Sequence, residues 1–374
     1  MDGNGLPEAL RSIMGLRGWS QLDLARELGV SQSWVSQASR GMRDPGIART
    51  ERLLNRIGWE VRISPISEDD PVRRREFVAA AASITFVPTP KVGPYQDPGY
   101  VRQLAERLAH DRYQQGGIPV VSTALRHLRK VGPAVSGSDR ALQEASSDLA
   151  CEAARVLYDS RRYAAAEQTG VFALDLARRS GSTRAQADAY STLSRINIDQ
   201  RRGDRGAMYA RLGLRLGDLP PARRAWLRLR LGRSLALLPG QERAAREVLE
   251  EALVVDGLPT YGMSDMLGNV GVAMLGMREH GGARSAIAEA VRLGAQCSTL
   301  LFVAYQAWEV EAALRAGDAP MAADRMTALA RIAPLVSSVR VNDHIAGVYR
   351  LSGRWAGLPE MHDAREQLHS VMRA

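Results

Sequence analysis

The sequence predicts a mainly α protein, in which a small N-terminal helix-turn-helix bundle precedes an α-solenoid of repeated helix pairs. Two observations predict this fold. Residues 20–41 have the caps and apolar spacing of two short helices joined by a tight turn. From about residue 101 onward, helical segments are broken at intervals of about 36–41 residues, and a helix-turn-helix unit repeated at such a period is typical of a solenoid.

The first elements form a compact bundle. A helix over residues 6–17 tolerates Pro7 in its first turn. A second helix begins after Ser20, whose hydroxyl is a predicted N-cap that Asp23 answers at the third helical position. Its apolar positions, Leu22 among them, face the other helices, and Gly29 ends it.

The helix over residues 32–40 is the predicted DNA reader. Ser31 caps it, and Val35 and Ala38 are its only clearly buried positions. A helix that buries so little is explained by amide and hydroxyl groups that face base edges in the major groove. The side chains predicted to contact bases or the backbone along it are Ser31, Gln32, Ser33, Trp34, Ser36, Gln37 and Arg40.

These residues resemble the helix-turn-helix of phage-repressor-like regulators, the xenobiotic-response-element (XRE) family. In that family a Gln that opens the second helix holds a phosphate and braces a Gln that opens the third, and here Gln21 and Gln32 occupy those places. The family's Gly, basic residue and Pro before helix four correspond to Gly41, Arg43 and Pro45. The resemblance therefore implies that Arg43 contacts a backbone phosphate.

A helix after Pro45 ends at Gly58, and residues 59–66 alternate apolar with polar side chains as a short strand does. A lone strand is not stable, so we expect a partner strand; because the neighbouring sequence offers no good partner, a symmetry-related copy is one candidate. This segment completes a predicted DNA-binding domain over residues 1–66.

Residues 67–100 are predicted to connect the domains. A helix over 68–84 carries Arg73–Arg75, which are either solvated or an arm with further phosphate contacts. Residues 85–100 contain four prolines and two glycines, so we expect a linker or an ordered loop. An Asp-Pro segment followed by Arg-Arg resembles the connection between reader and effector domains in regulators of the actinobacterial type.

Residues 101–374 form the predicted solenoid, which resembles tetratricopeptide repeats and ends in a capping helix over 357–373. Its small-residue helices, such as that beginning at Tyr163, are typical of this resemblance. The turns fall at Arg162-Tyr163, Gly203-Asp204, Gly240, Gly281-Gly282, Gly317-Asp318 and Gly353.

Three successive repeats carry side-chain amides at equivalent positions. Asn269 lies 12 residues before Gly281, and Gln306 and Asn342 lie 11 before Gly317 and Gly353. Such a column would hydrogen-bond an extended peptide backbone, as peptide-pheromone-sensing regulators of similar domain order do. Tyr305 and Trp308 either add an aromatic wall to this groove or pack in the core.

Composition narrows the function further. The net charge is +9, but residues 1–76 hold 12 Arg against 11 Asp and Glu, so +8 lies in the remainder. Two cysteines, Cys151 and Cys297, fit a reducing compartment and no zinc cluster. No signal peptide or membrane span is expected. We found no catalytic, metal or cofactor motif among the residues, so an enzyme is not expected.

The sequence thus predicts a cytoplasmic, nucleoid-associated transcriptional regulator. We expect a homodimer that reads an inverted repeat in a double-stranded DNA operator. A peptide or small-molecule effector in the repeat domain is expected to change the separation of the two readers. The alternative is a protein-interaction scaffold that the reader tethers to DNA, with no small effector.

Overall fold

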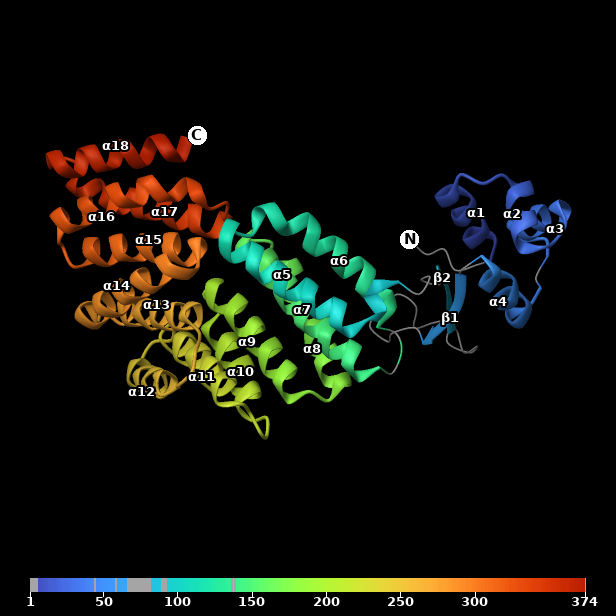
Figure 1. The fold of residues 1–374 in the computed structure, drawn as a ribbon, viewed down its shortest axis with the longest axis horizontal. Helices are drawn as coiled ribbons and strands as arrows, with labels where there is room; N and C mark the ends of the chain where they lie inside the picture. The colour runs from blue at the N-terminus through green and yellow to red at the C-terminus, as the bar shows by residue number, and fades with distance from the viewer. Residues whose placement is uncertain are drawn as a thin grey trace. The chain divides into compact units, whose positions relative to one another are not determined.

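A computed structural model describes residues 6–43, 45–57, 59–65, 82–88, 93–135, 137 and 139–373. The chain divides into two compact units, Met1–Gly93 and Pro94–Ala374 (Figure 1). The predicted connection over residues 67–100 is therefore shared between them. None of the helices in the described ranges is long and apolar enough to cross a membrane.

The described residues of the first unit form four helices: α1 (Leu6–Arg17), α2 (Gln21–Leu28), α3 (Gln32–Ser39) and α4 (Ile47–Arg56). The predicted bounds of the first three helices agree with these to within one residue. Leu10, Ile13 and Leu54 are fully buried in the core between them. The predicted inward position of Leu22 is wrong, because that side chain is 52% exposed.

The strand predicted at residues 59–66 is confirmed as β1 (Trp59–Pro65). Its predicted partner is wrong, because β1 pairs antiparallel with β2 (Ala82–Pro88) of the same chain, with Ile63 opposite Ile84. No symmetry-related strand is needed.

Part of the predicted connection is thus a strand. Residues 82–84 were assigned to a helix and 85–88 to a linker, yet the run from Ser83 to Val87 is rich in β-branched and aromatic residues, which favour strands. Pro88 stands at the last position of the strand, where proline is tolerated. The predicted helix over 68–81 and its Arg73–Arg75 arm lie outside the described residues.

The second unit is a tetratricopeptide-like α-solenoid. Its first helix begins at Pro98, before the predicted residue 101, because Asp97 caps the Gly99 N–H and proline suits the first helical position. Its helices are α5 (Pro98–Gln115), α6 (Val121–Ala134), α7 (Arg140–Asp159), α8 (Tyr163–Ser180), α9 (Thr183–Asp199), α10 (Gly203–Leu214), α11 (Pro221–Leu235), α12 (Glu242–Leu253), α13 (Thr260–Gly276), α14 (His280–Cys297), α15 (Thr299–Arg315), α16 (Ala319–Ile332), α17 (Val339–Leu351) and α18 (Pro359–Arg373), with short 3-10 turns η1 (Pro94–Gln96), η2 (Ile118–Val120), η3 (Ala333–Leu335) and η4 (Ser352–Trp355).

The helices form two layers. The first helices of successive pairs, α7, α9, α11, α13, α15 and α17, each pack on the next, and the second helices cover them from outside. The predicted turns lie at or beside the breaks inside pairs: Gly317 falls between α15 and α16, whereas Gly203-Asp204 and Gly281-Gly282 fall in the first turns of α10 and α14. The predicted capping helix is α18, which packs on α16.

The inner layer closes on itself, since α17 contacts α7 and α15 contacts α5 (Figure 1). The Ile118 N–H donates to the Ser337 carbonyl at 3.1 Å, and the Ser337 N–H donates to Gln115 at 2.8 Å. Gly116 permits this approach, because a Cβ there would lie 2.4 Å from the Ser337 oxygen. Segments from early and late repeats of the array therefore contact each other directly.

Buried Asp159 strengthens this closure. One of its carboxylate oxygens accepts from the Gly117 N–H at 2.7 Å, and the other accepts from Ser338 Oγ at 2.8 Å and Arg340 Nε at 3.2 Å. A single side chain at the end of α7 thus joins residues from both ends of the solenoid.

Candidate DNA-binding face and ligand cavity

The capped turn between α2 and α3 forms as predicted. Ser20 and Asp23 make a complete capping box, and Gly29 ends α2 with a left-handed φ of 66°. Ser31 Oγ accepts from the Trp34 N–H at 3.2 Å and caps α3. These local bonds fix where α3 begins and which of its faces points away from the bundle.

Trp34 lies on the buried face of α3, and its predicted contact with DNA is wrong. It is 5% exposed and packs with Val35 and Ala38 in the core of the first unit. Ser39 is also buried. Helical geometry explains the correction, because residues three and four apart share a face, so Trp34 and Ala38 turn inward together.

The remaining predicted contacts form one polar face. Gln32, Ser33, Gln37 and Arg40 are exposed, and Ser36 is partly exposed between them. The Arg40 guanidinium bonds Ser36 through both its carbonyl and its hydroxyl. Apart from such local bonds and one from Arg43 to Gln37, this face is turned to solvent.

The residues beside α3 that the family resemblance names show only part of the expected arrangement. Arg43 is exposed, and its Nη1 donates to Gln37 Oε1 at 3.4 Å. Exposed Ser31 bonds Ser33 at 3.0 Å. The expected brace between Gln21 and Gln32 is absent from the hydrogen bonds of the described residues, which leaves both amides available to another molecule.

The predicted amide column does not form a peptide groove. Asn269, Gln306 and Asn342 do lie on the inner helices α13, α15 and α17, but Asn269 and Gln306 are only 8% and 4% exposed, whereas Asn342 is exposed. The reason is close packing: a Cβ at Gly268 would lie 2.1 Å from the Tyr305 ring, so α13 and α15 bury the amides between them.

Asn269 belongs instead to a buried network around Asp265. Its Nδ2 donates to Asp265 Oδ1 at 2.9 Å, and the Tyr305 hydroxyl donates to the same oxygen at 2.6 Å. Tyr305 is therefore a core residue with a polar anchor, one of the two roles foreseen for it. Trp308, the other aromatic residue considered, is partly buried and packs against His344, with ring centroids 4.0 Å apart.

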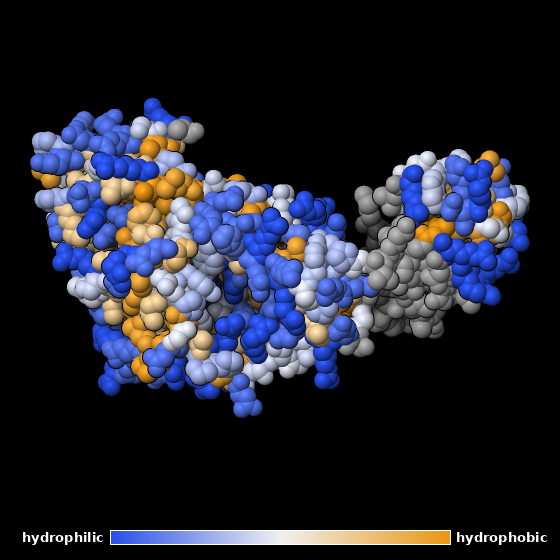
Figure 2. Space-filling view, viewed as in Figure 1, coloured by the Kyte–Doolittle hydropathy of each residue, from blue (hydrophilic) through white to orange (hydrophobic). Residues whose placement is uncertain are grey.

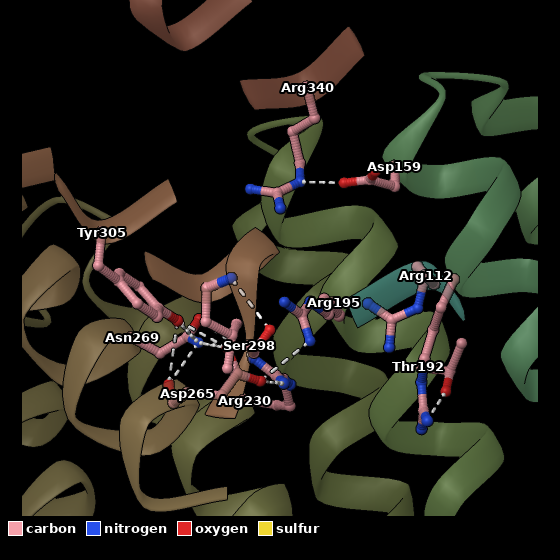
Figure 3. A network of polar contacts seen from close by, with 12 residues as sticks. Arg112, Asp159, Thr192, Arg195, Arg230, Asp265, Asn269, Ser298, Tyr305 and Arg340 are labelled. Carbon is pink, nitrogen blue, oxygen red and sulfur yellow. Dashed lines mark hydrogen bonds and ion pairs between the residues drawn. The ribbon is translucent and has the colours of Figure 1, made fainter. Parts of the chain in front are cut away.

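Two arginines reach Asp265 from neighbouring repeats (Figure 3). Arg195 Nη1 lies 3.2 Å and Arg230 Nη2 3.9 Å from Asp265 Oδ2. Burial alone would raise the pKa of Asp265, but the charges of Arg195 and Arg230 outweigh it and hold the pKa well below its usual range. Asp265 is therefore an anion at neutral pH.

Arg195 and Arg230 line a half-open cavity of about 620 Å³ between α5, α7, α9, α11, α13 and the end of α14. This volume lies within the range of about 300–1,000 Å³ that is common for ligand pockets. Figure 2 shows hydrophilic residues gathered at the hollowed middle of this unit. The polar and aromatic residues of the lining are Arg102, Glu106, His110, Tyr113, Gln114, Asp148, Glu152, Arg155, Arg184, Asp188, Ser191, Thr192, Arg195, Arg223, Trp226, Arg230, Tyr261 and Asp265.

Sequence reasoning missed this cavity. Its strongest signal is Asp265, the only charged residue in the otherwise apolar and small segment 260–276. A carboxylate at such a position requires a buried partner, but the sequence does not reveal that the partners come from α9 and α11.

Both cysteines also line the cavity. Burial raises the pKa of the Cys151 thiol to about 12 and also raises that of Cys297, so both remain protonated at neutral pH. Within the described part of the chain, no group of three or more His, Cys, Asp or Glu side chains is arranged to hold a metal ion.

Comparisons with known proteins bear on the fold. No protein-family model matches the sequence, and no curated protein matches it either. The crystal structure of a Rap protein complexed with competence and sporulation factor is similar at a TM-score of 0.50 and 10% identity, over 74% of this chain and 86% of that chain. This similarity supports the helical-repeat fold.

A second solved structure aligns over nearly the whole chain. It is Bacillus thuringiensis PlcR in complex with the peptide PapR7 and DNA, which matches 98% of this chain and 99% of that chain. The identity is 12% and the TM-score 0.36.

Proposed function

We propose that this protein is a sequence-specific transcriptional regulator, not an enzyme, and that α3 reads the operator. One observation carries the proposal: the exposed face of α3 presents Gln32, Ser33, Gln37 and Arg40 together, while its apolar face is buried. Amides and guanidinium groups on a helix of this width match the donor and acceptor pattern of the major groove. Arg43 and Gln21 flank this face and would hold phosphates.

The cavity of the second unit is the proposed effector site. It is within the size range of ligand pockets and is lined by polar groups from several repeats. A Rap protein of similar fold is known as a complex with competence and sporulation factor, which supports a ligand-binding role for a solenoid of this type. In our proposal, a peptide or small molecule in the cavity changes the affinity for DNA.

Membership of the XRE family, a homodimer and an inverted-repeat operator are the finer parts of the proposal. They rest on the capped helix-turn-helix and on the residues at Gln21, Gln32 and Arg43. Half-sites about one helical turn of DNA apart follow from a two-fold dimer with one reader on each subunit. The protein would then act in the cytoplasm, on the nucleoid.

Footprinting of the purified full-length protein on DNA upstream of its own gene tests the proposal, together with selection from a random DNA library. We expect a protected inverted repeat that is lost in the double variant Gln32→Ala/Gln37→Ala. Gln367→Ala, on the exposed side of the final helix α18, is the matched control. If neither experiment yields a site, or if the double variant binds like the parent, α3 is not the reader.

A further inference from the structure

The two arginines at the floor of the cavity have more donors than partners. A guanidinium has five N–H groups, yet the hydrogen bonds of Arg195 and Arg230 among the described residues are one each, to Asp265 Oδ2 at 3.2 Å and to Asn269 Oδ1 at 3.3 Å. Arg230 is 3% exposed, and its Nε has no hydrogen-bond partner in the part of the chain described. Arg230 is therefore a buried cation whose Nε–H lacks a hydrogen-bond acceptor among the described residues.

Neighbouring arginines deepen the deficit of negative charge on this side. Arg233 donates to the Asn269 carbonyl at 3.3 Å and not to a carboxylate. Arg112 and Arg155 share the single carboxylate of Glu152. Among the described residues, the ion pairs of these arginines are those of Arg112 and Arg155 with Glu152 and those of Arg195 and Arg230 with Asp265, while the charge of Asp199 acts on Arg233.

The other side of the cavity has acidic partners for its arginines. Arg184 is bonded to Glu144, Asp148 and Asp188, and Arg223 lies 2.8 Å from Asp188. Arg195 and Arg230 thus share one carboxylate, whereas Arg184 alone contacts three. Burial and the nearby charge of Arg195 lower the pKa of Arg230, which agrees with a cation that would be stabilised by an anion.

Aromatic side chains line the same cavity. Tyr113 and Tyr261 lie with their ring centroids 5.7 Å apart, and the Arg230 guanidinium lies 5.5 Å from the centre of the Trp226 ring. Rings of this kind favour flat or apolar groups, while arginines bind carboxylates and phosphates in a two-pronged geometry.

We propose that the cavity binds an organic anion, with a carboxylate or phosphate held between Arg195 and Arg230 and a flat or apolar body against Tyr113, Tyr261 and Trp226. This inference deepens the proposed function, on which its regulatory meaning rests. Asp265 acts as the internal counter-anion of Arg195 and Arg230. Loss of the Asp265 carboxylate by substitution would leave both guanidinium groups free to bind the ligand.

Isothermal titration of the full-length protein with small probes tests the inference at constant ionic strength. The probes are phenylacetate, phenyl phosphate and the neutral 2-phenylethanol. We expect both anions to bind and the alcohol to bind at least about tenfold more weakly, since hydrogen bonds to charged groups contribute about 1.5–3 kcal/mol. Tighter binding of phenyl phosphate identifies a phosphate ligand, and tighter binding of phenylacetate identifies a carboxylate ligand.

Two variants act in opposite directions. Arg230→Gln is expected to weaken anion binding about tenfold or more, whereas Asp265→Asn is expected to tighten it, a gain that loss of folding does not produce. Arg243→Gln on α12, whose side chain is 89% exposed, is the control for the loss of one positive charge. Absence of anion binding, equal binding of 2-phenylethanol, or unchanged affinity in folded Asp265→Asn would overturn the inference.

The outcome of this titration can be distinguished from the outcome of the DNA-binding experiment. A protein that protects DNA but binds neither anion retains the proposed DNA-reading function and loses this ligand assignment. A protein that binds the anions but no DNA retains the ligand assignment and loses the regulatory function.

Discussion

The reading face of α3 and the floor of the cavity are both polar, but they handle their polar groups in opposite ways. On α3 the side chains are exposed, and their hydrogen bonds join residues close in the sequence, such as Arg40 with Ser36 and Arg43 with Gln37. In the cavity, Arg195 and Asp265 are brought together from positions 70 residues apart. The polar groups of α3 stay hydrated until a partner binds, whereas those at the floor of the cavity are already buried in the folded protein.

This difference predicts two kinds of binding. The side chains of an exposed polar face are hydrated and must be desolvated when they bind. The affinity of such a face therefore depends on matching many partners at once, as base edges and phosphates provide. A buried and incompletely neutralised charge favours any anion that fits the space. Specificity at α3 therefore comes from pattern, and specificity in the cavity comes from charge and shape.

The largest expected effect separates the two faces of α3 itself. Trp34→Ala should lower the free energy of unfolding of the first unit by about 3–5 kcal/mol, because it empties a large buried site, whereas Gln37→Ala should change it by less than about 0.5 kcal/mol. Urea denaturation combined with hydrogen exchange of the α1–α4 amides measures both. Trp34→Phe is expected to retain DNA affinity; a loss of affinity in a folded Trp34→Phe protein would restore Trp34 as a DNA contact.

A second prediction compares two Asp–Arg pairs that join the end of α7 to α17. Asp159 is 1% exposed and bonded to Gly117, Ser338 and Arg340, so Asp159→Ala should destabilise the solenoid by about 3 kcal/mol. The pair of Arg161 with Asp343 is exposed, with an N–O distance of 2.7 Å. Asp343→Ala should therefore cost less than about 1 kcal/mol.

Chemical denaturation followed by circular dichroism distinguishes these variants. Equal destabilisation by Asp159→Ala and Asp343→Ala would show that the contact between α7 and α17 does not depend on the buried Asp159 carboxylate.

The same contrast explains how much the sequence could predict. Ser20, Gly29 and Ser31 act on neighbours within three or four residues, so the helix bounds and the capped turn followed from local rules. The repeat turns were predictable for the same reason, since each pair of helices is closed by its own turn. The prediction for Trp34 is wrong because its neighbours in the sequence are polar, whereas in the helix it shares the buried face with Ala38.

The cavity could not be predicted because its residues meet only through the superhelix. Asp265, Arg195 and Arg230 belong to three different repeats, and the closure of the solenoid depends on contacts between α5 and α15 and between α7 and α17. The amide column failed for a related reason. Equal spacing placed Asn269 and Gln306 on inner helices, but the depth of each position depends on how closely neighbouring helices approach.

A third prediction concerns the binding pattern of the reader. Gln37→Ala should weaken binding to the best operator by about 1–3 kcal/mol and relax the preference at one base pair. Arg43→Ala should weaken all DNA sequences alike and reduce the salt dependence by about one phosphate contact. Because Arg43 bonds Gln37 at 3.4 Å, the double variant should deviate from additivity. Binding measured against a set of single-base operator variants at two salt concentrations tests these patterns.

The smallest expected effect is the most local. Ser20→Ala removes the cap of α2 and should lower the free energy of unfolding of the first unit by about 1 kcal/mol. The hydrogen bonds from Ser20 lower the pKa of Asp23, so the ionised cap stabilises the fold above the ordinary value of 3.8, and this contribution is lost as the pH falls through the folded pKa. The difference between parent and Ser20→Ala, measured by thermal denaturation, should thus be smaller at acidic than at neutral pH. A difference that grows on acidification would mean that Asp23 stabilises the unit through a partner other than Ser20, and the contrast between a locally built reader and a cavity built across repeats would then be weaker.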